Sequence, residues 1–228
     1  MKFREVLIGT VCLSVGLGGG FFTANTLNRS DVISPTADGS ASCPSASTAT
    51  VAVGEAQQDV SAALQSAESD PQNFAAQMIA GDMYAKIGRF EKAVEFYKRG
   101  VLINPSNFQA NVVLANALFD SQKFEEAESY YAKALEINPK DINARTDLGA
   151  TFVERAVPNY DRAIAELSKV REAEPGHLPS LYYLGIATLR KGDKIGAEKI
   201  LAELKATGPN SELVGKLQQN LDAQGITQ

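Results

Sequence analysis

The sequence lacks tryptophan and contains only two cysteines and one histidine among its 228 residues. Cys12, Cys43 and His177 do not have the spacing of a structural metal site. Positive charge is also scarce, because 22 lysines and arginines are outnumbered by 27 aspartates and glutamates, which gives a net charge of −5. A nucleic-acid-binding domain usually has a basic face. We therefore predict no bound metal, no other cofactor and no nucleic-acid partner.

The sequence also lacks a group of residues with the chemistry of an active site. A catalytic site needs a nucleophile, an acid–base pair or a metal cluster in one place. His177 falls at a predicted turn, where we expect a solvent-facing loop residue. Carboxylates are plentiful, but Glu125 and Glu126 lie beside Lys123, an arrangement that is typical of a solvated helix face. We therefore predict that the protein is not an enzyme.

What the sequence does contain is a repeat. The stretch 74–105 recurs 34 residues later as 108–139, and two further copies follow at 142–175 and 178–209. The residues that return in register between the first two copies are Ala93, Tyr97 and Pro105, then Ala127, Tyr131 and Pro139. A fixed period of about 20–50 residues indicates a repeat array. We therefore predict an array of four copies.

Small and aromatic residues within a copy occur where two antiparallel helices would need them. Gly81 and Ala93 allow the two helices to approach closely, and the residues that fill the space beside them are Tyr84, Phe90 and Tyr97. An Asn-Pro pair follows the second helix in two copies, and the residue before a proline avoids the helical conformation. Each copy is therefore predicted to be a helix–turn–helix unit.

This pattern resembles the tetratricopeptide repeat, a helix–turn–helix motif of about 34 residues. The matching residues of the first copy are Gly81, Tyr84, Phe90, Ala93, Tyr97 and Pro105, and those of the second are Ala115, Phe124, Ala127, Tyr131, Ala134 and Pro139. The tryptophan of the consensus is absent from every copy. The resemblance covers residues 71–210 and implies an all-α solenoid that binds proteins.

The expected domain is residues 54–228. Its repeats are expected at about 74–107, 108–141, 142–177 and 178–211, with two extra residues in the inter-helix turn of the third. End repeats expose an apolar face that needs a cover. We therefore expect capping helices at about residues 54–69 and 210–223.

Residues 1–29 are expected to form a transmembrane signal anchor. Residues 6–28 contain no charge and begin with an apolar run that reaches membrane-spanning length. Lys2 and Arg4 precede this run, which predicts a single-pass protein of the inner membrane with its domain on the extracytoplasmic, periplasmic side. Residues 30–53 are rich in Ser, Thr, Ala and Pro, and are expected to form a flexible tether. The alternative is a cleaved signal that yields a secreted or periplasmic protein.

The resemblance implies that the first helices line a concave groove. The candidate residues for binding a protein or peptide there are Met78, Asp82, Val112, Asn116, Phe119, Tyr182 and Ile186. For Phe119 and Ile186, packing against the neighbouring repeat is an equal alternative. Co-chaperone members of this family grip a carboxylate with lysine, arginine and asparagine, and the corresponding residues here are Met78, Asp82, Val113, Asn143 and Asp147, which do not match.

Two functional hypotheses follow from these features. The first is a membrane-tethered scaffold or adaptor that binds a protein or peptide in its groove and acts in the assembly of an envelope complex. The second is a structural subunit that self-associates through its repeats into a homo-oligomer. Only self-association would make the apparent size depend on the chain's own concentration.

Overall fold

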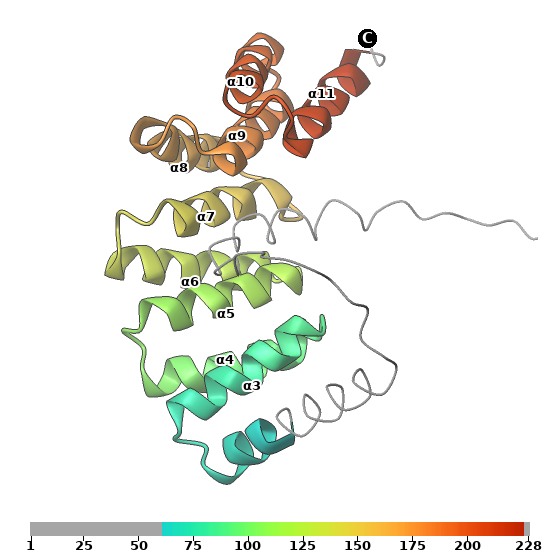
Figure 1. The fold of residues 1–228 in the computed structure, drawn as a ribbon. Coiled ribbons are helices and arrows are strands. Elements are labelled where there is room, and N and C mark those ends of the chain that lie inside the picture. Colours follow the sequence, from blue (N-terminus) through green and yellow to red (C-terminus); the bar gives the residue numbers. More distant parts are fainter. Residues whose placement is uncertain (1–60, 226–228) are drawn as a thin grey trace, which may run out of the picture. The chain divides into compact units, whose positions relative to one another are not determined.

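Pairs of helices make up the part of the chain that the computed structural model describes, residues 61–225. The helices bounded within this range are α3 (Phe74–Lys86), α4 (Phe90–Ile103), α5 (Phe108–Asp120), α6 (Phe124–Ile137), α7 (Ile142–Glu154), α8 (Tyr160–Ala173), α9 (Leu178–Arg190), α10 (Lys194–Thr207) and α11 (Glu212–Gly225). Residues 61–69 are also helical. Figure 1 shows the helices stacked in the order of the sequence. The prediction of an all-α helical repeat solenoid is confirmed.

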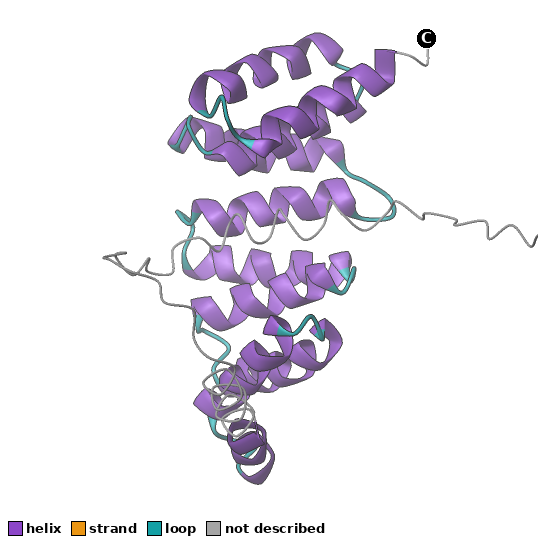
Figure 2. Cartoon of the chain, turned by 45° about the vertical axis from the view of Figure 1, so that its right-hand side comes forward, coloured by secondary structure: helices purple, strands orange, loops and turns teal. Residues whose placement is uncertain are grey.

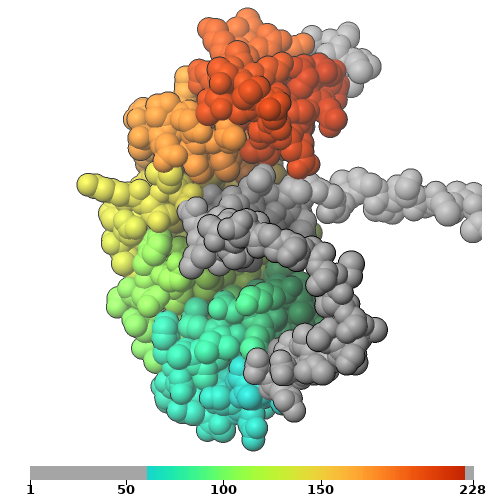
Figure 3. Space-filling model, in the orientation of Figure 1, coloured from blue at the N-terminus to red at the C-terminus, as the bar shows by residue number. Residues whose placement is uncertain are grey.

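Each repeat consists of a first and a second helix that pack against each other, as α3 does with α4 and α5 with α6. The second helix of one repeat also packs against the first helix of the next, as α4 does with α5 and α8 with α9. Figure 2 shows loops joining the helices, and in Figure 3 the repeats form successive bands whose colours follow the sequence. Contacts are therefore mainly between neighbouring repeats, which makes nearest-neighbour packing the source of stability.

The first helix of every repeat begins with a side-chain cap at the same register position. Each capping side chain accepts a hydrogen bond from the backbone N–H three residues later, and the capping residues are Asn73, Asn107, Asp141 and His177. Such caps satisfy backbone donors that have no partner within the helix. The repeat period therefore includes the signal that starts each first helix.

His177 lies at the turn that the sequence predicts, but it is half-buried. Its Nδ1 accepts from the backbone N–H of Ser180 at 3.4 Å. Burial lowers the pKa of the His177 imidazole, and the nearby charge of Glu174 opposes this shift only in part. A neutral ring keeps Nδ1 available as an acceptor. The expectation of a solvent-facing loop histidine is therefore wrong, because the ring caps α9.

Small residues lie where the two helices of a repeat touch, as predicted. A Cβ added to Gly81 would collide with the ring of Tyr97. Ala93 and Ala127 are both 0% exposed. Larger side chains at these places would force the helices apart or off their rotamers. Close approach of the two helices therefore depends on these small residues.

The third repeat contains the predicted insertion. Helix α7 ends at Glu154 and α8 begins at Tyr160, so residues 155–159 connect them, whereas residues 121–123 suffice between α5 and α6. The Asn159 side chain caps α8 by accepting from the N–H of Arg162 at 3.1 Å. The two extra residues therefore lengthen the turn without changing the helix pair.

Both ends of the array are covered by additional helical residues. Leu213, Leu217 and Leu221 of α11 are at most 4% exposed, and α11 packs against α9 and α10. At the other end, Ala67 is fully buried in a cluster with Ala76, Ala80 and Phe96. These helices cover apolar faces that would otherwise meet water.

The predicted signal anchor at residues 6–28 and the tether at residues 30–53 lie outside the described residues, as does the start of the N-terminal capping helix. Within residues 61–225, no helix combines the length and apolar character needed to cross a membrane.

Candidate functional site

The first helices α3, α5, α7 and α9 form a continuous surface, here called the inner face. Helix α5 contacts α7, and α7 contacts α9, so the first helices of the second, third and fourth repeats are direct neighbours. The second helices α4, α6, α8 and α10 form the opposite surface, here called the outer face. A segment lying along the inner face would therefore meet side chains from several repeats at once.

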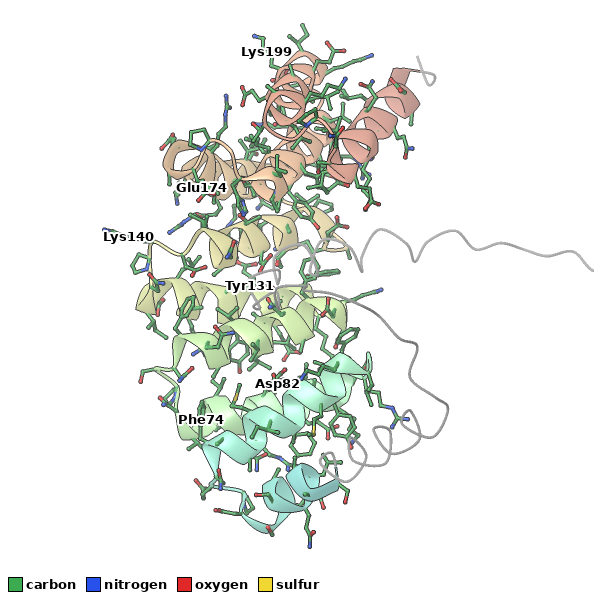
Figure 4. All side chains as sticks on the ribbon, viewed as in Figure 1. Phe74, Asp82, Tyr131, Lys140, Glu174 and Lys199 are labelled. Atoms are coloured by element: carbon green, nitrogen blue, oxygen red, sulfur yellow. The ribbon has the colours of Figure 1, made fainter. Side chains whose placement is uncertain are left out.

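Four of the predicted site residues reach solvent on this face. Asp82 is exposed, and Met78, Val112 and Tyr182 are half-buried. Asp82 also has a structural role, because its Oδ1 accepts from the Tyr97 hydroxyl at 2.6 Å. Figure 4 labels Asp82 on α3. Tyr182 therefore remains the largest predicted side chain that is available to a ligand.

The other three predicted site residues are packed inside the array. Asn116, Phe119 and Ile186 are only 5–6% exposed. The Asn116 Oδ1 accepts from the hydroxyl of Tyr131 at 2.6 Å, and the Phe119 ring meets the Phe124 ring edge-on, with centroids 5.3 Å apart. The expectation that Asn116 faces a ligand is wrong, because its amide serves a buried tyrosine. For Phe119 and Ile186, burial favours the packing alternative.

The hydrogen bond between Asn116 and Tyr131 repeats that between Asp82 and Tyr97, one repeat earlier. In both, an acceptor on the first helix pairs with a tyrosine hydroxyl on the second. A buried tyrosine hydroxyl usually finds a partner. These polar residues of the first helices therefore join the two helices of a repeat.

A second group of side chains on the inner face contains one predicted site residue, Tyr182, and four residues that were not predicted. We call it the acidic–tyrosine cluster, and it consists of Asp120 on α5, Asp147 and Glu154 on α7, and Tyr182 and Tyr183 on α9. The rings of Tyr182 and Tyr183 meet edge-on, with centroids 5.2 Å apart. The cluster therefore combines groups from three successive repeats.

The Tyr183 hydroxyl is the centre of this cluster. Its pKa is raised well above that of an ordinary tyrosine, first by burial and then by the charge of Glu154, with Tyr182, Asp147 and Asp120 adding to the shift. Tyr183 is 6% exposed, and no residue among those described forms a hydrogen bond with its hydroxyl. At neutral pH the group is therefore an uncharged hydroxyl surrounded by negative charge.

Glu154 is a carboxylate of the cluster that forms no ion pair with a described residue. No described residue forms an ion pair or hydrogen bond with its carboxylate. Its side chain keeps contact with water, yet the surrounding protein removes enough hydration that burial raises its pKa, and the charge of Arg190 opposes the shift. Glu154 is exposed on one side, but a carboxylate beside a protein wall loses solvent even when one side stays open.

The cluster does not have the arrangement of a metal site. Among the described residues, no group of three or more histidines, cysteines and carboxylates could hold a metal ion.

A depression on the outer face between α8 and α10 is a weaker candidate for a binding site. Its lining includes Arg171 and Glu203, which form an ion pair at 2.7 Å and so satisfy each other.

Comparison with protein families identifies the repeats. Three family models, each described as a tetratricopeptide repeat, match residues 53–106, 111–141 and 158–221. These segments together cover more than half of the chain. The chain belongs to the tetratricopeptide repeat family. A comparison with curated protein sequences finds no match.

Solved structures share the tetratricopeptide repeat fold. A MamA protein has a TM-score of 0.63 at 22% identity, over 71% of this chain and 87% of its own. YrrB, described as a TPR protein with an unusual peptide-binding site, has a TM-score of 0.65 at 20% identity, over 75% of this chain and 88% of its own. PilW, described as a widely conserved type IV pilus biogenesis factor, has a TM-score of 0.59 at 19% identity, over 77% and 84% of the two chains. At these identities the similarity shows a common fold.

The tetratricopeptide register contains a signal that could have found the cluster. Asp120 and Glu154 end the first helices of the second and third repeats, where Lys86 and Arg190 end those of the first and fourth. Residues at the same position of successive repeats lie on neighbouring helices. Comparing charges at that position along the array indicates that acidic residues meet in the middle repeats.

Proposed function

We propose that this protein is a membrane-tethered scaffold or adaptor that binds a segment of another protein on its inner face and serves in the assembly of an envelope complex. The observation that carries the proposal is the acidic–tyrosine cluster. Its Tyr183 hydroxyl and Glu154 carboxylate have no partner among the described residues. Glu154 is exposed and Tyr182 is half-buried, so a ligand can reach both from solvent. Their presence on one surface favours a ligand.

The solved structures support this function by analogy. One protein of the same fold is described by its peptide-binding site and another as a pilus biogenesis factor. The fold alone does not determine function, so the proposal rests on the site. The uncharged stretch at residues 6–28 supports the membrane tether, and the basic residues before it favour an extracytoplasmic domain at the inner membrane.

Site-specific photo-crosslinking in native membranes tests the binding surface. A photoreactive residue replaces Gln109, which is exposed on α5 of the inner face, and in a control it replaces Ala132, which is exposed on α6 of the outer face. We expect the Gln109 variant to give a discrete adduct with another protein, and the Ala132 variant to give none. Adducts only from Ala132 would contradict the proposal. An adduct of two copies of this chain would instead support self-association.

Membrane attachment has a separate test. The full chain is expected to sediment with membranes and to resist extraction at alkaline pH, whereas a chain that lacks residues 1–29 should be released. Recovery of the full chain in the supernatant would contradict the tether and favour the cleaved, exported alternative.

A further inference from the structure

We infer that His177 is a pH-sensitive switch at the junction of the third and fourth repeats. When its ring takes up a proton, Nδ1 exchanges a hydrogen-bond donor on α9 for an acceptor on α7, and the first turn of α9 loses its cap. The geometry that carries this inference is the position of Nδ1, which lies 3.4 Å from the backbone nitrogen of Ser180 and 3.5 Å from Oγ1 of Thr146. This response to acid is separate from the proposed binding of a protein segment.

The backbone N–H of Ser180 depends on the His177 ring. Pro179 has no N–H, and the N–H of Leu181 already donates to the His177 carbonyl oxygen at 3.1 Å. Ser180 is 0% exposed, so water does not replace the ring as an acceptor. A buried donor without a partner is costly. Loss of the acceptor at Nδ1 therefore loosens the first turn of α9.

Thr146 supplies the second partner of the ring. Its hydroxyl donates to the carbonyl oxygen of Ile142 at 2.7 Å, so its hydrogen is used and its oxygen can still accept. A neutral Nδ1 without hydrogen accepts from the N–H of Ser180. A protonated ring carries N–H on both nitrogens, so it opposes that N–H with a second donor and can donate to the Thr146 oxygen. Protonation therefore moves the hydrogen bond from α9 to α7.

Glu174 is the charged group that acts on the ring. It ends α8 and is labelled in Figure 4. Its charge raises the pKa of His177 less than burial lowers it. The first turn of α9 has no acidic residue. Charged residues at the adjoining ends of the other helices packed on α9 are Asp141, Arg145 and Asp147 of α7, Arg171 and Glu172 of α8, Lys205 of α10 and Glu212 of α11.

The direction of the response follows from this lowered pKa. The contribution of the His177 cap to stability is present above the ordinary histidine pKa of about 6.5. It is lost as pH falls from that value toward the lowered one, because the unfolded chain then binds the proton more readily. Asn73 and Asn107 cap α3 and α5 with amides, which do not titrate. Mild acid should therefore loosen the start of α9 and leave the starts of α3 and α5 unchanged.

NMR of the full-length chain in a mild detergent tests the switch, because the chain has one histidine and its ring signals need no assignment. We expect the ¹⁵N signals to show Nδ1 without hydrogen at neutral pH, and a pKa below the ordinary histidine value. Thr146→Val removes the acceptor of the protonated ring and should lower this pKa further. A hydrogen on Nδ1 at neutral pH, or a pKa that Thr146→Val leaves unchanged, would overturn the exchange of partners.

Hydrogen exchange of the same protein measures the consequence for α9. After correction for the intrinsic effect of pH on exchange, protection of its first turn should fall about threefold to tenfold between about pH 7.5 and pH 5.5. The first turns of α3 and α5 are internal controls and should not change. His177→Asn supplies the cap of α3 and α5 to α9, and should reduce the change to less than about twofold. Equal losses of protection in all three helices, or a loss that persists in His177→Asn, would overturn the switch.

Discussion

Glu154 on the inner face and three carboxylates on the outer face of this array lie in different surroundings. On the outer face, ion pairs join the second helices of successive repeats, namely Lys98–Glu126 at 2.6 Å, Arg162–Glu128 at 2.6 Å and Arg171–Glu203 at 2.7 Å. On the inner face, Glu154 has no ion pair with any described residue. These three outer carboxylates are therefore paired within the fold, whereas Glu154 forms no such pair.

The pKa shifts follow the same division. A hydrogen bond from Lys98 is the largest contribution that lowers the pKa of Glu126 on the outer face, whereas burial raises the pKa of Glu154 on the inner face. A lowered carboxylate pKa means that the protein stabilises the charge, and a raised one means that it does not. This difference supports interpreting the inner face as the binding surface.

The largest effect on stability is expected where the two faces join. Ala127→Leu places a larger side chain at a 0% exposed position of α6 that a first helix contacts, and should destabilise the fold by about 1–3 kcal/mol. Glu126→Ala, one residue away on the exposed surface, should cost under about 1 kcal/mol. Urea denaturation measures both, and equal midpoints would contradict the register of the repeats.

Asn116→Ala tests whether a polar residue of a first helix belongs to the fold. The substitution leaves the Tyr131 hydroxyl without its acceptor and should cost about 1–2 kcal/mol. Asn116→Asp is the matched control, because Asp82 has the corresponding role in the first repeat and keeps an acceptor oxygen. Thermal unfolding should rank the wild type first, Asn116→Asp next and Asn116→Ala last. Equal stability of the wild type and Asn116→Ala would contradict the structural role, and Asn116 would again be a candidate ligand-binding residue.

A double-mutant cycle on Arg171 and Glu203 measures what an outer ion pair contributes. Both side chains are about two-fifths exposed, at 43% and 40%. Exposed pairs contribute about 0.2–1 kcal/mol, and salt screens them. The coupling energy should therefore be small and should fall as salt is added. A coupling that persists in high salt would show that this pair is shielded from solvent.

The pH dependence of stability should have opposite signs for Glu154 and Glu166. Burial raises the pKa of Glu154, so its favourable contribution exists below the ordinary carboxyl pKa and is lost as pH rises through the raised value. Glu154→Gln should therefore be slightly stabilising at neutral pH, and this advantage should vanish in acid. Burial also acts to raise the pKa of Glu166, but hydrogen bonds from Lys169 and Arg145 outweigh it and lower the pKa.

The contribution of Glu166 is therefore present above the ordinary carboxyl pKa and is lost as pH falls through the lowered value. Glu166→Gln should destabilise the fold at neutral pH and should cost less in acid. Urea denaturation between about pH 3 and pH 7 measures both variants against the wild type. The same sign for the two variants would contradict the distinction between a paired and an unpaired carboxylate.

The sequence predicts the helix pairs because their causes are local and repeated. Gly81 and Ala93 recur in register as small residues, and an Asn-Pro pair ends the second helix. The extra residues near 157–159 also appear as a change of period. Backbone conformation and close helix contact depend on neighbours within one repeat. The helix pairs can therefore be predicted from a single sequence.

The site was harder to predict because it depends on burial and on contacts between repeats. Asn116 occupies a first-helix position typical of a ligand contact, yet Tyr131, fifteen residues later, uses its amide. Tyr183 lies next to the predicted Tyr182 but becomes buried only when α9 packs on its neighbours. The groups around its hydroxyl come from three repeats. Periodicity predicts which residues share a helix face, but it does not predict which of their side chains a neighbouring helix will bury.

The pKa of Glu154, measured by ¹³C NMR of its side-chain carboxyl, tests the difference between the faces most directly. We expect a value above that of an ordinary glutamate, because burial disfavours its charge and no described residue pairs with it. A Glu154 pKa at or below the ordinary glutamate value would contradict the account.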